Sequence, residues 1–359
     1  MSTHVVEVIK VKLNPHPNAD SLSIVQVHGW ECAVRTQDWE DGDLAAYIPP
    51  DSVVPETEPF AFLKSDSQNW NRIRARRFRG RISLGLLVPA PKGAKEGDDV
   101  MEQMGITHYE PPMPLSSGGD NEKAPSGYYP TYDVENFNRY GDVFREREEV
   151  IATEKINGES ARYVWVQQDL EGGCNIDWVD GEPKTSAVVV GKSGRMYCSS
   201  HYNWKKQDEK NTWWQALKQN PWIEEWCRAN PGLVLYGETF GYVKNYKYGA
   251  KPGQVFFRVF DILDKDRWMG VDEITDRGWG RPTLGSDTGI LAQLHWVPEV
   301  YRGPFDEAKL RELAEEDSLI DGANHLREGI VISPVKERVD PSLGRVKLKI
   351  VSPRYLEKK

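Results

Sequence analysis

Short apolar segments separated by turn-forming residues constrain the fold of this chain more than any other feature. Between Val5 and Ala90 the segments VVEVIKVKL, SLSIVQVHG, ECAVRT, LAAYIPP and ISLGLLVPA are broken by Pro, Asn, Asp and Gly. Apolar and polar positions that alternate between turn residues are typical of β-strands. We therefore expect a small antiparallel β-barrel at the start of the chain.

A change in composition divides the sequence after this block. Residues 110–132 are rich in Pro, Gly and Ser and have little periodic hydrophobicity, which is typical of a linker or long loop. The segments that follow include EEVIATEKI, LVLYGETFG and QVFFRVFDIL, which indicate strands, while helices are predicted over 211–230 and 305–317. We predict an α+β chain with a barrel over 1–105, a linker over 106–135 and a mainly antiparallel domain over 136–359.

Overall composition excludes several classes of protein. Across 359 residues no run approaches the roughly 20 apolar residues that span a bilayer, and the N-terminus lacks the apolar core of a signal peptide. We expect a cytoplasmic protein with no membrane partner. The four cysteines are scattered without a C-x-x-C spacing, which favours reduced thiols. A net charge of -9 argues against coating nucleic acid by bulk charge but allows a local basic surface.

One basic stretch lies inside the predicted barrel. Six arginines occur within ten residues, separated only by Ile, Ala, Phe and Gly: Arg72, Arg74, Arg76, Arg77, Arg79 and Arg81. In an extended strand Arg72, Arg74 and Arg76 would share one face and could contact successive phosphates. We predict nucleic-acid binding by Arg72, Arg74, Arg76, Arg77 and Arg79. A charged strand edge that prevents aggregation is the alternative interpretation.

The second domain carries five short motifs in a fixed order. The first is EKINGES, with Lys155, Asn157 and Gly158, a spacing that chance alone supplies easily. The others are YGETFG with Glu238, FRVFDI with Phe260 and Asp261, EGIVIS with Glu328, and VKLKIVS with Lys347 and Lys349. This ordered set resembles the motifs of covalent nucleotidyltransferases, and of the polynucleotide ligases in particular.

The resemblance extends over nearly the whole chain. The sequence is similar to the ATP-dependent RNA ligases typified by the Deinococcus enzyme, in which an oligonucleotide-binding (OB) barrel precedes the catalytic domain. HPNADSLSIVQVHG also resembles the opening of the oligonucleotide-binding barrels that bind transfer RNA, which supports the barrel rather than a transfer RNA ligand. Asn157 stands where DNA ligases have aspartate, and Ser160 where DNA ligases and capping enzymes have arginine. About ten residues follow Lys349, so we expect no C-terminal barrel.

The resemblance implies a role for each motif residue. Lys155 would be the nucleophile that becomes adenylylated, and Lys347 and Lys349 would contact the α-phosphate. Glu238 and Glu328 would hold Mg²⁺ or Mn²⁺, which prefer oxygen ligands. The nucleotide would be bound by Glu154, Ile156, Asn157, Gly158, Lys192, Arg195, Glu238, Phe260 and Val331. Within this set Asn157 would reach the ribose, and Phe260 and Val331 would sandwich the adenine.

The chemistry also sets an expectation for the nucleophile. An amine attacks a phosphorus atom only when it is unprotonated, so we expect burial and neighbouring cations to lower the pKa of Lys155 from about 10.4. Each motif residue also has a purely structural interpretation. Phe260 could be a core residue, Glu238 and Glu328 ordinary strand-end carboxylates, and Lys347 and Lys349 part of an amphipathic edge strand.

By resemblance the enzyme would use ATP in three steps: adenylylation of lysine, transfer of AMP to a 5′-phosphate, and attack by a 3′-hydroxyl. The expected substrate is a nicked RNA or RNA/DNA duplex whose 3′-hydroxyl strand ends in RNA, and the expected state is a monomer. Three alternatives stay open: a non-catalytic RNA-binding protein, an enzyme that stops at adenylylation, and a capping-like guanylyltransferase.

Overall fold

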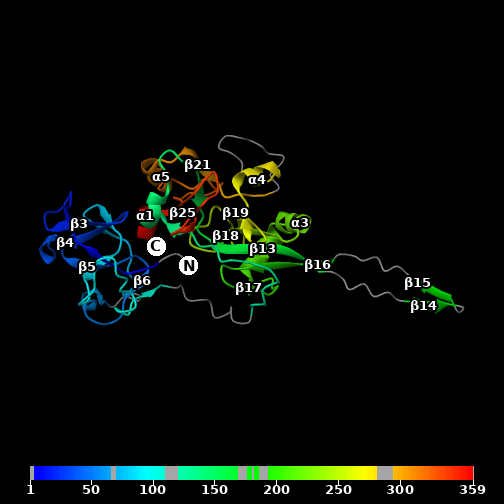
Figure 1. The fold of residues 1–359 in the computed structure, drawn as a ribbon, viewed down its shortest axis with the longest axis horizontal. Coiled ribbons are helices and arrows are strands. Elements are labelled where there is room, and N and C mark those ends of the chain that lie inside the picture. Colours follow the sequence, from blue (N-terminus) through cyan, green and yellow to red (C-terminus); the bar gives the residue numbers. More distant parts are fainter. Residues whose placement is uncertain are drawn as a thin grey trace.

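The computed structural model describes residues 4–65, 70–109, 120–168, 176–179, 182–185, 193–280 and 294–358. Two β-rich domains lie end to end, and both chain termini lie near the seam between them (Figure 1). The β14–β15 hairpin (Ile176–Val179 and Glu182–Thr185) pairs only with itself within these residues. Within the described parts, no helix combines the length and apolarity needed to cross a membrane.

Antiparallel strand pairs build the first domain, as the sequence predicts. One sheet has the order β1-β5-β9 and a second the order β2-β3-β4, while β6 pairs with β10 and β7 with β8. The strands are β1 (Glu7–Lys10), β2 (Leu13–Pro15), β3 (Leu22–Val27), β4 (Trp30–Arg35), β5 (Leu44–Ile48), β6 (Ser52–Val53), β7 (Arg76–Phe78), β8 (Arg81–Ser83), β9 (Leu86–Pro89) and β10 (Thr107–His108). Two short 3-10 helices, Thr36–Asp38 and Ala61–Leu63, lie between them.

Strand β5 organises the interior of this domain. Successive side chains of a strand point to opposite faces. Ala45 and Tyr47 therefore belong to one apolar cluster and Ala46 and Ile48 to another, and all four are buried. Because both faces of β5 are covered, its near-continuous apolar sequence LAAYI suits a central strand.

The second domain contains two larger sheets. The five-stranded sheet has the order β11-β25-β22-β12-β21, and the six-stranded sheet has the order β17-β16-β13-β18-β19-β20. Every neighbouring pair is antiparallel except β11 with β25. The strands are β11 (Glu135–Asn136), β12 (Glu149–Lys155), β13 (Glu159–Gln168), β16 (Ser193–Ser199), β17 (Trp204–Lys205), β18 (Leu233–Gly241), β19 (Val255–Asp264), β20 (Arg267–Trp268), β21 (Glu299–Pro304), β22 (Gly329–Pro334), β23 (Val339–Asp340), β24 (Gly344–Arg345) and β25 (Leu348–Val351).

Short helices surround these sheets. They are α1 (Phe137–Tyr140), α2 (Thr212–Gln219), α3 (Trp222–Ala229), α4 (Val271–Asp276), α5 (Glu307–Ala314) and α6 (Pro353–Lys358). The single helix predicted over 211–230 is two helices, because it is interrupted at Asn220 and Pro221. Proline has no N–H to donate and disfavours a helical residue before it. Trp214 and Trp226 from these helices pack on Tyr163 and Phe257 of the six-stranded sheet.

The predicted linker is shorter in the structure than in the sequence prediction. Thr107 and His108 form β10 and pair with β6, so they belong to the first domain. Residues 120–134 lie against the second domain: Asn121 forms a bridge with Lys205, and the backbone carbonyls of Tyr129 and Pro130 accept hydrogen bonds from Arg162. The Pro- and Gly-rich composition therefore marked an irregular segment, part of which packs against the second domain.

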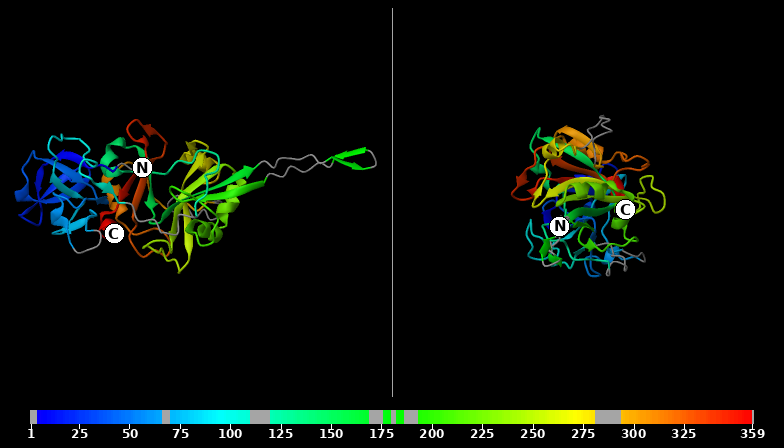
Figure 2. Two further views of the ribbon diagram at one scale, coloured as in Figure 1. Left: turned by 90° about the horizontal axis from the view of Figure 1, so that it is seen from below. Right: turned by 90° about the vertical axis from the view of Figure 1, so that its right-hand side faces the viewer.

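The seam between the domains is polar. Glu7 pairs with Arg139 at 3.1 Å, and Arg77 donates to both carboxylate oxygens of Glu357 at 2.6 Å. The N–H of Gly29 donates to the carbonyl of Asn138, and a Cβ at Gly29 would lie 2.5 Å from the Asn138 side chain. Figure 2 shows the C-terminus, and with it α6, at this seam.

Candidate active site

Two neighbouring strands bring Lys155 and Glu328 together. Lys155 is the last residue of β12 and pairs with Gly329, the first residue of β22. Gly329 has a φ of +157°, and a Cβ there would lie 2.0 Å from the Ile350 carbonyl oxygen, so a larger residue would push the strands apart. This tight crossing places the Lys155 Nζ atom 2.5 Å from Glu328 Oε1.

A second carboxylate faces this ion pair. Glu238 lies on β18 opposite Ser160, and burial together with the nearby Glu328 raises the pKa of Glu238 to about 8. Burial pushes the pKa of Lys155 down, but the charges of Glu328 and Glu238 outweigh it, so the pKa of Lys155 is raised. The expected lowering is therefore wrong for the protein by itself, because carboxylates are the nearest charges to the amine.

Lys155 lies at the edge of a cavity of about 270 Å³ between the two sheets. This volume is close to the lower end, roughly 300 Å³, of small-molecule sites. The cavity is lined by Tyr132, Asp133, Val134, Thr153, Glu154, Lys155, Ile156, Ser160, His201, Glu238, Phe260, Val297, Val331, Lys347 and Lys349. Eight residues of the predicted site are thus brought together here: Glu154, Lys155, Ile156, Glu238, Phe260, Val331, Lys347 and Lys349.

Apolar and polar groups are separated within the cavity. Phe260 and Val331 both contribute to its walls, and the Phe260 ring packs on Tyr132 with 4.5 Å between ring centroids. Glu154 is buried, which raises its pKa, although its carboxylate accepts hydrogen bonds from Ser318 Oγ at 2.5 Å and the Leu319 N–H at 2.7 Å. The cavity can therefore hold a flat ring whose polar edge meets fixed groups.

The two C-terminal lysines have different surroundings. Lys347 donates to Asp261 Oδ2 and to the Tyr132 hydroxyl, both at 2.7 Å. Burial opposes ionisation of Asp261, but Arg345 and Lys347 hold its pKa far below the ordinary value. Burial and the charge of Lys155 lower the pKa of Lys349 to about 8. The amphipathic edge-strand alternative is wrong, because β25 is paired with both β22 and β11.

Asn157 and Gly158 lie on the other side of the lysine, outside the first cavity. The Asn157 side chain donates to Glu328 Oε2 at 3.0 Å and to the Tyr355 hydroxyl at 2.7 Å. The Asn157 N–H donates to the Tyr248 hydroxyl. A Cβ at Gly158 would lie 2.3 Å from the Thr239 carbonyl oxygen, so glycine permits a close backbone crossing here.

One predicted basic residue, Arg195, does not line the nucleotide cavity. Arg195 lies on β16, where it pairs with Glu122 at 2.5 Å and packs over the Tyr197 ring. Its predicted nucleotide contact, which came from the loosely matched motif GKSGRM, is therefore not supported, because the Arg195 side chain is exposed on β16. Lys192 lies outside the described residues.

The arginines of the basic stretch fall into two groups, those with an ion-pair partner and those without one among the described residues. Arg72 pairs with Asp51 and covers the Tyr109 ring, Arg77 pairs with Glu357, and Arg81 pairs with Glu31 at 2.5 Å. The expected ribbon is not formed, since Arg72 precedes β7 and a turn at Arg79 and Gly80 ends that strand. Three arginines of the predicted set, Arg74, Arg76 and Arg79, are exposed and form no ion pair within the described residues.

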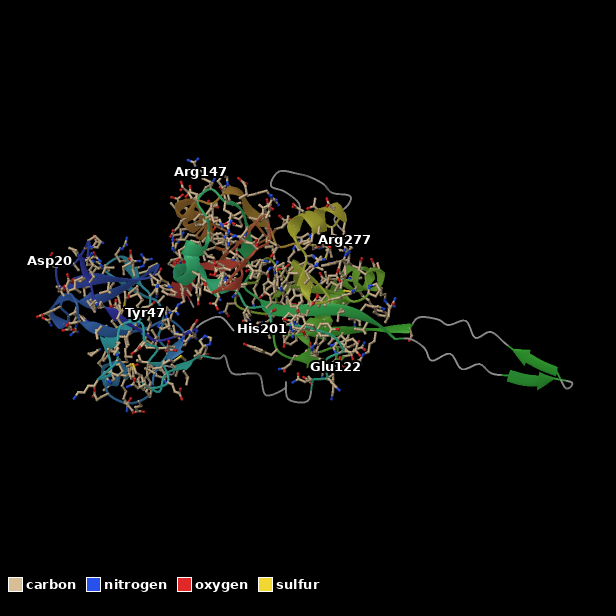
Figure 3. The ribbon with its side chains drawn as sticks, viewed as in Figure 1. Asp20, Tyr47, Glu122, Arg147, His201 and Arg277 are labelled. Atoms are coloured by element: carbon tan, nitrogen blue, oxygen red, sulfur yellow. The ribbon has the colours of Figure 1, made fainter. Side chains whose placement is uncertain are left out.

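Sequence motifs did not reveal several cavity residues. Tyr132 and Asp133 come from the predicted linker, and His201 lies between β16 and β17, 3.5 Å from the Asp133 carboxylate. Figure 3 shows His201 within the second domain. A Tyr-Asp pair at the end of a loop carries no signal of its own, so only the fold could identify these residues.

Glu238 and Glu328 also suit a divalent cation. Both carboxylates line the same groove, and carboxylate oxygens are the donors that Mg²⁺ and Mn²⁺ take, with water and substrate phosphate as the remaining ligands. No group of three or more His, Cys, Asp or Glu side chains that could hold a metal occurs within the described ranges. The donor set therefore fits a cation that is shared with a bound phosphate.

Comparisons with known proteins agree with this geometry. The RNA ligase family model matches residues 148–351, and an OB-fold domain model matches residues 5–90. The structure is similar to a Naegleria gruberi RNA ligase with PPi (TM-score 0.71, 22% identity, 99% of this chain and 98% of that chain). It is also similar to a point mutant of that ligase with ATP and Mn (TM-score 0.70, 22% identity, 99% of each chain). No curated protein matched.

The RNA ligase model covers the α+β domain that holds Lys155, Glu238 and Glu328, and the OB-fold model covers the domain before it, which places the protein in the class of RNA-joining enzymes. The chain belongs to the RNA ligase family. The likeness to the Naegleria structures shows that this protein and that ligase have the same overall fold over nearly the full length of each chain.

Proposed function

We propose that this protein is an ATP-dependent RNA ligase that works through a covalent lysyl-AMP at Lys155. One observation carries the proposal: Lys155 lines both a cavity whose walls suit a nucleotide and a larger groove that is also lined by the OB-fold domain. The amine can then accept AMP from one side and pass it to an RNA end on the other. The Naegleria ligase structures with ATP and Mn, and with AMP and Mn, support the choice of nucleotide and metal.

The residues around the amine suggest how it reacts. Phe260 and Val331 would hold the adenine between them, and Glu154 would lie near its polar edge. Lys347 and Lys349 would meet the α-phosphate, where positive charge stabilises the transition state. As the phosphate enters, Glu328 would exchange its contact with Lys155 for one with a cation, and the amine could release its proton to solvent. Attack of the neutral amine on the α-phosphorus would then form the N–P bond as the bond to pyrophosphate breaks.

A divalent cation would be held by Glu238 and Glu328. When bound, it would neutralise phosphate oxygens and remove the carboxylate charges that now raise the pKa of Lys155. The protein itself orients the Glu328 carboxylate: Asn157 donates a hydrogen bond to Glu328, and Tyr248 and Tyr355 hold Asn157 in place.

For the substrate we propose a nicked duplex whose 3′-hydroxyl strand ends in RNA, sealed in the manner of the Deinococcus-type ligases. The OB-fold domain and the exposed Arg74, Arg76 and Arg79 support binding of a phosphate backbone. We further propose that the protein acts as a monomer in the cytoplasm, with a first domain that includes β10 and a second domain that includes residues 120–134.

Labelling with radioactive nucleotide tests the proposal. The protein is incubated with α-labelled ATP or GTP and with Mg²⁺ or Mn²⁺, then separated on a denaturing gel. We expect acid-labile label from ATP alone, lost in Lys155→Ala. Label from GTP alone would favour a capping-like enzyme. Absence of label, in a protein shown by mass spectrometry to carry no AMP already, would favour a non-catalytic RNA-binding protein.

A further inference from the structure

A groove of about 710 Å³ opens on the side of Lys155 away from the nucleotide cavity. One wall comes from the OB-fold domain and contains Asp51, Arg72, His108 and Tyr109. The other wall is a loop of the catalytic domain between β18 and β19, and Val243, Lys244, Asn245 and Tyr246 line the groove. An RNA end that reaches Lys155 from this side must pass between these two walls.

Free positive charge in the groove comes from the loop. Three Lys or Arg side chains line the groove: Arg72, Lys155 and Lys244. Arg72 pairs with Asp51, and Lys155 pairs with Glu328. Lys244 is exposed and forms no ion pair within the part of the chain that the structure describes. Arg72, one of the arginines predicted to bind nucleic acid, is thus already neutralised by Asp51.

Residues 242–251, YVKNYKYGAK, alternate aromatic and basic side chains. The Tyr242 side chain is 48% exposed, and the Lys247 Nζ atom lies 4.4 Å from the centre of its ring. Lys247 and Lys251 are exposed and, like Lys244, have no ion-pair partner among the described residues. Exposed aromatic rings next to unpaired cations are the combination that binds single-stranded bases and phosphates.

The loop is held rigidly where it meets the active site. The Tyr246 ring stacks on His325 with 4.1 Å between centroids. Tyr248 is buried, and its hydroxyl accepts the Asn157 N–H at 2.7 Å. Gly249 lies against Gly322, where a Cβ would be 2.8 Å from the carbonyl oxygen. Tyr246 and Tyr248 are thus fixed by contacts with the active-site side of the domain, whereas Tyr242, Lys244 and Lys247 of the same loop are exposed.

We propose that residues 242–247 form the catalytic-domain contact surface for the RNA strand ends at the site of joining. Lys244 contacts the phosphate nearest to Lys155, and Tyr242 and Lys247 contact the ribose-phosphate chain farther out. This proposal rests on the RNA-joining function proposed above. It assigns to this loop the phosphate contacts that the sequence predicted for the arginine stretch of the OB-fold domain.

Binding measurements with a labelled nicked RNA duplex, in metal-free buffer at several KCl concentrations, test the proposal. Lys244→Gln/Lys247→Gln should raise the dissociation constant about tenfold at low salt. It should also make the slope of log affinity against log salt shallower by roughly 1 to 2, since each phosphate contact contributes about 0.9. Tyr242→Leu should weaken binding and leave the slope unchanged.

Lys206→Gln/Lys210→Gln is the matched control, because both lysines are exposed, form no ion pair within the described residues and lie between β17 and α2, outside the lining of the groove. Equal affinity and slope in both double variants would overturn the proposal. Loss of Lys155 labelling with unchanged RNA affinity would assign Lys244 to the ATP phosphates and would also overturn it.

The two proposals can fail separately. A wild-type protein that takes label from ATP but does not bind the duplex would overturn the loop proposal and leave the adenylylation chemistry standing. A wild-type protein that binds the duplex through the loop but takes no label would overturn the proposed ligase function alone.

Discussion

A single hydroxyl group connects the predicted linker to the nucleotide cavity. The Tyr132 hydroxyl donates to Asp261 Oδ2 at 2.6 Å and accepts from Lys347. Tyr132→Phe should slow adenylylation of Lys155 roughly tenfold, because a hydrogen bond to a charged group contributes about 1.5 to 3 kcal/mol. Single-turnover labelling with ATP measures this rate. Tyr128→Phe, at a 58% exposed position in the same segment, is the control. Equal rates in both variants would remove Tyr132 from the mechanism.

Asp261 should make the free energy of unfolding depend on pH in the acidic range. Its pKa is held far below the ordinary 3.8, so the folded protein keeps this carboxylate ionised while the unfolded chain protonates it. The resulting stability is present above pH 3.8 and is lost as pH falls below it. In urea unfolding, each pH unit below 3.8 should cost the wild type about 1.4 kcal/mol more than Asp261→Asn. Parallel pH profiles for the two proteins would contradict this assignment.

At this scale the motifs predicted much of the site. Lys155, Glu238, Glu328, Lys347 and Lys349 were identified because their chemical types recur in a fixed order. The same reasoning missed the partners that hold them. Tyr132 and Lys347 are 215 residues apart in the chain, and no local spacing encodes such a contact. The pKa of Lys155 was also mispredicted, since it depends on which charges the fold places nearest.

Among the elements, α6 connects the two domains to the active site. Tyr355 on α6 accepts a hydrogen bond from Asn157, and Glu357 on the same helix pairs with Arg77 of the first domain. Tyr355→Phe should slow adenylylation about fivefold, as expected for one hydrogen bond of about 1 kcal/mol.

Tyr246→Phe is the matched comparison for this helix. The Tyr246 hydroxyl is buried without a partner among the described residues, and its ring packs against Tyr355. Its removal should slow the same reaction less than Tyr355→Phe does. Measurement of the rate across ATP concentrations separates the effects, because loss of positioning lowers kcat and leaves KM unchanged. The opposite order of the two variants would exclude a positioning role for Tyr355.

Strand patterns were the most predictable elements, and charge runs the least. Alternation of apolar residues identified segments such as β12 and β18. The arginine stretch was expected to be one extended strand, but β7 contains only Arg76–Phe78. Arg79 and Gly80 then turn the chain with φ values of 45° and 91°. Ion-pair partners such as Glu357 lie almost at the other end of the sequence, so the sequence could not show which arginines were free.

For the whole molecule, the position of a truncation should decide whether the catalytic domain works. A fragment of residues 120–359 keeps Tyr132 and Asp133 at the cavity, whereas a fragment of residues 136–359 lacks both. The longer fragment should label with ATP and fail to seal RNA. The shorter fragment should label at least about tenfold more slowly, for the reason given for Tyr132.

Circular dichroism of both fragments provides the control for folding. If the longer fragment seals nicks as well as the full chain, the proposed role of the OB-fold domain is wrong. If the two fragments label equally, residues 120–135 serve only to connect the domains.

The polar seam between the domains has a consequence for any kinetic study. Its ion pairs, Glu7 with Arg139 and Arg77 with Glu357, join partly exposed groups, and such pairs weaken as ions screen them. Salt would then act twice: once on the attraction between protein and RNA, and once on the docking of one half of the enzyme against the other. Ionic strength would therefore change how the two domains are docked. The salt dependence of ATP labelling measured without RNA isolates this effect on domain docking from the effect on RNA binding.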